Sequence, residues 1–358
     1  MKINNLLLSM VMIAPLFSCS DKNVAVNEVA IEGQMVNTKE NEGKDVVWFF
    51  KDKIYARDTK FNIYSEKLTK TQWKKSEMIF VSGHGHNEFG HPILSQDNNG
   101  ALYVLDRPFE GDKLLSLTKI PHTDSIAAIK NQSKWEKYDL KQLPPFWVMG
   151  TNFEVLSDST ILVAGTPADD MKHVFSIINF KNQTVTPLNY WPDDDTPDNY
   201  ESTFYKMLVY SNGTDVKGNG KGRHLYWNDS GKIAFIFTVD GAEINILSSM
   251  YNEEHLPLPT SGEAPLIERI CGCSNNDRIY LLYKDSNCKG EKKKKWDMKD
   301  PFPMGNTVEV YDWDGVNQQV IHLDKFGQSI MLSEDGKTLY LNSGWDSNIY
   351  SYDLTSLK

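Results

Sequence analysis

Short runs of apolar residues, separated by clusters of polar turn residues, recur along most of the chain. Two β-forming runs joined by a turn rich in Asp, Asn, Ser or Gly are the signature of a β-hairpin. Six such hairpins are predicted, and they cover residues 46–56, 93–105, 153–164, 224–237, 267–283 and 330–341. The pattern therefore predicts a protein built from strands.

A third β-forming run follows each hairpin, and several of these runs lead to a fourth, more polar run. The third runs lie at 61–64, 114–117, 174–180, 244–247, 308–311 and 349–352, and the fourth runs at 135–140, 184–188 and 318–323. A polar last strand suits the outer edge of a sheet, where one side of the backbone faces solvent. Four strands repeated six times predict an all-β fold, a β-propeller of six blades with four antiparallel strands each.

The fourth repeat leaves an alternative open. Residues 204–210 and the Gly-rich loop 211–223 could pair with His224–Trp227, which would shift the strand register or add a seventh, degenerate blade. Because the segment 212–222 holds few apolar residues, it is expected to be mobile rather than packed. It has no Ser or Thr after its Lys and no helix, so a phosphate-binding loop is not predicted.

The N-terminal residues precede the repeats. Residues 20–42 are expected to act as a tether, although 29–36 alternates well enough to form an edge strand. In closed propellers such a strand often completes the last blade. The predicted organisation is a signal peptide at 1–18, a tether with a blade-closing strand at 19–42, and a propeller domain at 43–358.

The extreme N-terminus carries a targeting signal. Lys2 precedes the apolar run 6–17 and then Ser18-Cys19, and an apolar run this short predicts a signal peptide rather than a membrane-spanning helix. Residues 16–19 resemble the lipobox of a bacterial lipoprotein, which implies that Cys19 is lipidated and anchors the protein in the cell envelope. The alternative is an ordinary secretory signal with an incidental Cys.

The segment 81–106 combines a glycine-hinged loop with a hairpin. It resembles the blade-joining motif of NHL-type propellers, and the matching residues are Gly83, Gly85, Glu88, Phe89, Pro92, Tyr103, Val104 and Asp106, while His86 and Asn87 replace a Pro-Gly pair. The body of the chain is similar to the TolB-like, NHL-related six-bladed propeller lipoproteins of Bacteroidetes. Residues 20–23 resemble a partial export tag of surface lipoproteins in that group. The resemblance implies an outer-membrane lipoprotein, periplasmic or surface-exposed, with a binding or scaffold role.

The net charge limits the classes of binding partner, and the cysteine content limits the disulfides that can form. A net charge of −10 argues against nucleic acid, whose phosphates require a basic surface. After Cys19 only Cys271, Cys273 and Cys288 remain, and three buried thiols are expected, with a Cys273–Cys288 bridge as the alternative. The run of lysines at 292–295 is interpreted as a solvated loop, with a docking patch for an anionic partner or a lipid head group as the alternative.

Local catalytic or metal motifs are weak. His84 and His86 share one side of an extended segment near His91, so they are weak metal candidates, but no Cys or acidic ligand at suitable spacing joins them. The carboxylates at 193–198 lack the spacing of a calcium loop. No nucleophile elbow is present, and neither a metal nor a cofactor is predicted.

Propellers usually bind ligands at one end of the central channel. The residues expected there lie just before or within the inner hairpins: His84, His86, Asn87, Glu88, Trp147, Asn152, Glu154, Tyr205, Lys206, Glu268, Arg269, Gln328 and Ser329. A structural pair between blades is the alternative for Glu268 and Arg269, and core packing is the alternative for Trp147.

The functional hypothesis is a monomeric, lipid-anchored, non-enzymatic module that binds a protein, peptide or glycan. The alternative is an envelope hydrolase or lyase acting on glycans or lactones, with carboxylates or a metal in the channel, because a site assembled from separate blades leaves no local motif.

Overall fold

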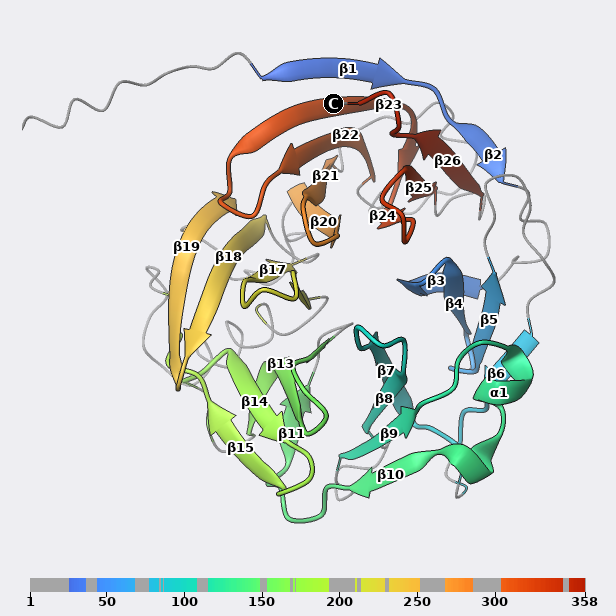
Figure 1. The fold of residues 1–358 in the computed structure, drawn as a ribbon, viewed down its shortest axis with the longest axis vertical. Coiled ribbons are helices and arrows are strands. Elements are labelled where there is room, and N and C mark those ends of the chain that lie inside the picture. The colour runs from blue at the N-terminus through green and yellow to red at the C-terminus, as the bar shows by residue number, and fades with distance from the viewer. Residues whose placement is uncertain are drawn as a thin grey trace, which may run out of the picture.

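The computed structural model describes residues 26–36, 44–67, 77–83, 85, 87–107, 115–148, 153–167, 170, 172–192, 210, 214–228, 232–251, 268–285, 304–343 and 348–357. These residues form six sheets arranged radially around one axis (Figure 1). Each sheet is built on four antiparallel strands or a close variant of that arrangement. The predicted all-β, six-bladed propeller is confirmed.

The first three blades follow one another along the chain. Blade 1 contains β3 (Lys44–Phe50), β4 (Lys53–Asp58), β5 (Ile63–Lys67) and β6 (Glu77–Phe80). Blade 2 contains β7 (His91–Gln96), β8 (Leu102–Arg107), β9 (Ser116–Ile120) and β10 (Glu136–Asp139), with the short helices α1 (Ile126–Ile129) and η2 (Gln132–Lys134) before β10. Blade 3 contains β11 (Phe146–Val148), β12 (Glu154–Val155), β13 (Thr160–Pro167), β14 (Phe175–Asn179) and β15 (Thr184–Pro187), and both β11 and β12 pair with β13.

The last three blades close the ring. Blade 4 contains β16 (Thr214–Gly218), β17 (His224–Asn228), β18 (Ile233–Asp240) and β19 (Glu243–Tyr251). Blade 5 contains β20 (Glu268–Ser274), β21 (Ile279–Asp285), β22 (Met304–Tyr311) and β23 (Asn317–Gly327), and blade 6 contains β24 (Ser329–Leu332), β25 (Thr338–Asn342) and β26 (Ile349–Asp353). The N-terminal strands β1 (Asn27–Ile31) and β2 (Gln34–Val36) add to blades 5 and 6.

Blade 4 corrects the predicted register. His224–Trp227 and Ile233–Phe237 are strands, but they are the second and third strands of the blade, because β16 pairs with β17 on the inner side. The segment expected to be mobile therefore contains a strand. One apolar residue is enough here, since Val216 is 1% exposed within the core shared with blade 3, and five residue pairs join β16 to β17.

The core lies between neighbouring blades rather than inside any one of them. Six apolar clusters are present among the described residues, one at each junction between blades. In β8, Leu102 and Val104 face blade 1 while Tyr103 and Leu105 face blade 3. Because strand residues alternate between two faces and both faces are covered, the inner strands are apolar at almost every position.

The N-terminal segment crosses from blade 5 to blade 6 on the outside of the ring (Figure 1). β1 pairs in parallel with β23, and β2 pairs antiparallel with β26. At the crossing, Gly33 N donates to Asp324 Oδ1 at 2.9 Å, and the Tyr352 hydroxyl donates to the same oxygen at 3.1 Å. A side chain at Gly33 would collide with the Tyr352 ring, so the crossing requires glycine.

Replacing Asp324 by Asn is expected to loosen this crossing. Partial burial raises the pKa of Asp324, but the hydrogen bonds from Gly33, Lys325 and Tyr352 outweigh it, so the pKa lies below its ordinary value. The ionised form therefore stabilises the fold above the unfolded pKa of about 4, and this contribution is lost as the pH falls through the lower folded pKa. At pH 7 the Asp324→Asn variant is expected to lose about 1 kcal/mol, measured by chemical denaturation.

The pH dependence separates this effect from a general loss of charge. The difference between wild type and Asp324→Asn should shrink in acid, below pH about 4. Glu334→Gln, which removes an exposed carboxylate from blade 6, serves as the control and should leave stability unchanged. Equal effects of the two substitutions at pH 7 would contradict the proposed importance of the crossing.

Candidate functional site

The junction of blades 1 and 2 contains a turn organised by one carboxylate. Asp58 accepts hydrogen bonds from the backbone N–H groups of Lys60 and Asn62, both at 2.9 Å. It also accepts from Asn62 Nδ2 at 3.0 Å and from the Tyr64 hydroxyl at 3.1 Å. Burial raises the pKa of Asp58, but these donors together hold it below its ordinary value. The turn is therefore closed around an ionised side chain.

This turn holds Phe61 in an unusual conformation. Its φ of 65° lies in the left-handed region, which a bulky residue adopts only when its surroundings impose it. The Arg57 guanidinium lies 5.2 Å from the centre of the Phe61 ring, and the His91 imidazole meets the ring edge-on at 4.8 Å. All three side chains are partly exposed. We name Arg57, Phe61 and His91 the Phe61 cluster.

The connection from blade 1 to blade 2 packs beside the turn. Ser82 N donates to Asn62 Oδ1 at 2.9 Å, which joins the connection to the turn that contains Phe61. Glu88 folds back over the connection, where its Oε2 accepts from Gly85 N at 2.8 Å. A side chain at Gly83 or Gly85 would overlap the Glu88 carboxylate. Glu88 therefore shapes the loop, while its side chain stays exposed.

Two further polar residues fix the ends of this connection. Asn87 turns toward the outer part of blade 2, where Lys137 Nζ donates to its Oδ1 at 2.5 Å and Asn87 Nδ2 donates to Gln132. Asp106 accepts from Gly90 N at 3.1 Å and from His91 N at 2.9 Å. Burial raises the pKa of Asp106 above its ordinary value against the effect of those donors. Asp106 thereby positions the backbone that carries His91.

A second polar pair joins blades 3 and 4. His224 Nδ1 donates to Glu154 Oε2 at 2.7 Å, and the two side chains are 9% and 17% exposed. Glu154 lies on β12 and His224 opens β17. The Glu154 carboxylate occupies the space beside Gly218, where a side chain would overlap it. The predicted site residue Glu154 is thus paired with a histidine that was not predicted as a site residue.

Some of the remaining predicted site residues are described in the structure, and others lie outside its described ranges. Gln328 is partly exposed just before β24, its N–H donates to Asn342 O at 2.8 Å, and Ser329 opens that strand. The backbones of Trp147, Glu268 and Arg269 lie in β11 and β20. Six predicted residues lie outside the described residues: Cys19, His84, His86, Asn152, Tyr205 and Lys206. The assignment of all these residues to a ligand site stays a prediction.

The predictions about metal ligands and thiols concern residues that the structure describes only in part. Within the described ranges, no group of three or more His, Cys, Asp or Glu side chains is placed to hold a metal ion. Cys273 is a buried free thiol, and burial raises its pKa well above the ordinary value. Cys288 lies outside the described residues. No helix in the described part of the chain is both long and apolar enough to cross a membrane.

Comparisons with known proteins find solved structures of low similarity to this chain. No known protein family and no curated protein matches the chain. A solved auxiliary nutrient binding protein from Bacteroides ovatus has 11% identity and a TM-score of 0.48, with 90% of this chain and 75% of that chain covered. A Bacteroides thetaiotaomicron protein of unknown function has 11% identity and a TM-score of 0.43, covering 90% and 72%. An oligogalacturonate lyase in complex with manganese has 11% identity and a TM-score of 0.40, covering 85% and 74%. These likenesses concern the fold alone.

The site contains residues that sequence reasoning did not select. Asp58 followed four residues later by Asn62 is a turn signal that could have been noticed, because Asp side chains commonly cap their own turns. The positive φ of Phe61 has no such signal, and the contact between Phe61 and His91 joins two different blades.

Substituting Gly218 by Ala is expected to break the hydrogen bond between Glu154 and His224. The new methyl group would displace the Glu154 carboxylate and leave the buried imidazole N–H unpaired, at a cost of about 1–3 kcal/mol. Chemical denaturation of Gly218→Ala, Glu154→Ala and the double variant forms a cycle. In the Glu154→Ala background, the Gly218→Ala substitution should cost little. Simple addition of the two effects would contradict the coupling.

Proposed function

We propose that the chain is a lipid-anchored cell-envelope protein that binds a protein, peptide or glycan through its propeller without transforming it. The observation that carries this proposal is the Phe61 cluster. Its aromatic ring is partly exposed, belongs to a residue in the Asp58 turn, and contacts both a guanidinium and an imidazole.

The chemistry of the Phe61 cluster fits recognition. An aromatic ring offers a large contact area at a low cost in conformational entropy, and a nearby guanidinium adds a fixed donor for carboxylate or hydroxyl groups. Because the backbone at Phe61 is already held in place, little ordering is needed when a ligand binds. The position is also rigid at its base, where Asn62 and Ser82 join the turn to the connection.

The envelope address rests on the N-terminal residues. The apolar segment before Cys19 and the lipobox-like residues 16–19 support lipidation of Cys19 and export. Membership of the TolB-like, NHL-related group is part of the same proposal. It is supported by the motif at 81–106, in which Glu88 and Asp106 accept backbone hydrogen bonds that shape the loop.

An enzyme is the second candidate, specifically a hydrolase or lyase acting on glycans or lactones. The observation in its favour is the hydrogen bond between His224 and Glu154, because a carboxylate that orients an imidazole is a common general-base arrangement. Turnover of a glycan or lactone that is abolished in Glu154→Gln, with the melting temperature preserved, would favour this candidate over the binding module.

Binding is tested with the full chain on glycan and peptide arrays. Phe61→Asn is expected to reduce the signal of bound ligands by about tenfold, because it removes the ring while Asn tolerates the left-handed backbone. Lys51→Asn is a matched control, since Lys51 is an exposed residue that also has a positive φ of 46°. It should leave binding unchanged. Equal binding by wild type and Phe61→Asn would contradict the assignment of the site.

Lipid anchoring is tested separately in a bacterial host. Wild type is expected to incorporate an alkyne-tagged fatty acid and to sediment with membranes, whereas Cys19→Ser should do neither, because the acyl chains supply the membrane affinity. Cys273→Ser controls for acylation of other thiols and should behave as wild type. Labelling that persists in Cys19→Ser would overturn the lipoprotein assignment.

A further inference from the structure

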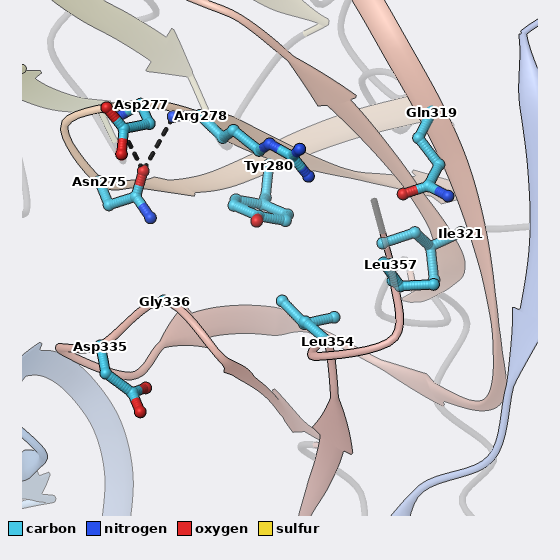
Figure 2. A pocket seen from close by; sticks show the side chains of 10 residues that line it. All are labelled: Asn275, Asp277, Arg278, Tyr280, Gln319, Ile321, Asp335, Gly336, Leu354 and Leu357. Carbon is cyan, nitrogen blue, oxygen red and sulfur yellow. Dashed lines mark hydrogen bonds between the residues drawn. The ribbon is translucent and has the colours of Figure 1, made fainter.

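A separate pocket of about 170 Å³ lies between blades 5 and 6. Its walls come from the turn after β20, from β21 and β23, from the turn between β24 and β25, and from the C-terminal residues after β26 (Figure 2). The volume exceeds by far the ~10–15 Å³ that a single water requires. The pocket is therefore large enough for a small organic ring.

One wall of the pocket contains a buried side-chain amide whose oxygen accepts no hydrogen bond. Gln319 is 2% exposed, and its Oε1 has no hydrogen-bond partner. Figure 2 shows this carbonyl oxygen on the pocket side of the amide. The alternation along β23 places Gln319 on the same face as Ile321 and Leu323, which belong to the core between blades 5 and 6. An uncompensated polar group at a core position costs free energy, so a ligand donor is the simplest compensation.

The charged residues around the pocket restrict the ligand. Arg278 lines the pocket together with the exposed residues Asp277 and Asp335. A cationic ligand would face the Arg278 guanidinium, and an anionic ligand would face two carboxylates. A neutral molecule whose groups both donate and accept hydrogen bonds satisfies all three side chains as well as Gln319. Hydroxyl groups have this property.

The pocket also has a preformed frame. Asn275 Oδ1 accepts from the backbone N–H groups of Asp277 and Arg278 at 2.9 and 2.8 Å, as the dashed lines in Figure 2 show. Lys337 N donates to Asp335 Oδ1 at 3.0 Å, which fixes the facing turn. The buried side chains of Leu354 and Tyr280 provide apolar contact between these polar walls. Most of the accessible pocket lining is polar, which suits the hydroxyl groups of a sugar ring.

We propose that this pocket binds a single neutral hexose unit, with Gln319 Oε1 accepting from one sugar hydroxyl and Arg278 donating to another. The site is distinct from the Phe61 cluster, which lies between blades 1 and 2. It therefore goes beyond the proposed recognition of a partner at that cluster.

The test is ligand-observed saturation-transfer NMR with the full chain and D-glucose, D-galactose and D-mannose. At least one of these hexoses should show saturation transfer, and D-glucuronate and D-glucosamine should compete poorly. The corresponding methyl glycosides distinguish a free sugar from the end unit of a glycan. Absence of transfer from all three hexoses, or stronger binding of a charged sugar, would overturn the proposal.

Gln319→Leu provides the sharpest variant, since it removes the unmet acceptor and keeps a similar volume. It is expected to weaken hexose binding by about tenfold or more and to leave the melting temperature equal or higher. Gln318→Leu is the matched control, because Gln318 is the exposed neighbour on the opposite face of β23. A lower melting temperature or unchanged binding in Gln319→Leu would refute the role of Gln319.

Two other variants complete the experiment. Arg278→Met should also weaken hexose binding, which tests the second polar contact independently of Gln319. Phe61→Asn should bind hexose as wild type does. Failure of hexose binding with an intact array signal at the Phe61 cluster would reject this pocket alone, so the two proposals fail separately.

Discussion

Packing of each blade against both of its neighbours is the constraint on which the rest of the structure depends. A blade has two apolar faces, and neither can be buried within the blade itself. The ring therefore has to close, because a missing contact would expose one face of two different blades. The six apolar clusters supply the driving force, and the outer edges of the sheets remain free to be polar.

Closure depends on a small N-terminal segment that acts at two blades. β2 supplies the outer strand that blade 6 does not otherwise possess, and β1 extends blade 5 by a parallel strand. Asp324 connects these two additions, since its carboxylate reaches both the Gly33 backbone and the Tyr352 hydroxyl. The ring is thus joined by backbone pairing at its outer edge as well as by apolar contact in its interior. The same solution appears at a smaller scale in the loops, where Asp58, Glu88 and Asp106 each accept backbone N–H groups.

The sequence predicted the repeated sheet well because alternation and turn chemistry are local. Five of the six predicted hairpins are the inner pairs of their blades. The exception is blade 4, where the inner strand β16 has Val216 as its buried apolar residue and a glycine required by Glu154. Because β16 contains few apolar residues, the apolar pattern of the sequence did not predict it as a strand. The parallel pairing of β1 with β23 was likewise hidden, since no local signal specifies a partner that lies about three hundred residues away.

The candidate sites were less accessible to sequence reasoning for the same physical reason. Glu88 and His91 could be selected from one segment, but the ring and cation beside His91 come from another blade. Gln319 can be selected as a candidate only from the structure, because its neighbours show that an amide occupies a core position. In a propeller, side chains from adjacent blades meet at junctions whose apolar interiors are already fixed. The polar residues at one junction can then vary with little effect on the other five junctions, because each apolar cluster is separate. This independence allows one ring to carry a cationic aromatic cluster at one junction and a polar pocket at another.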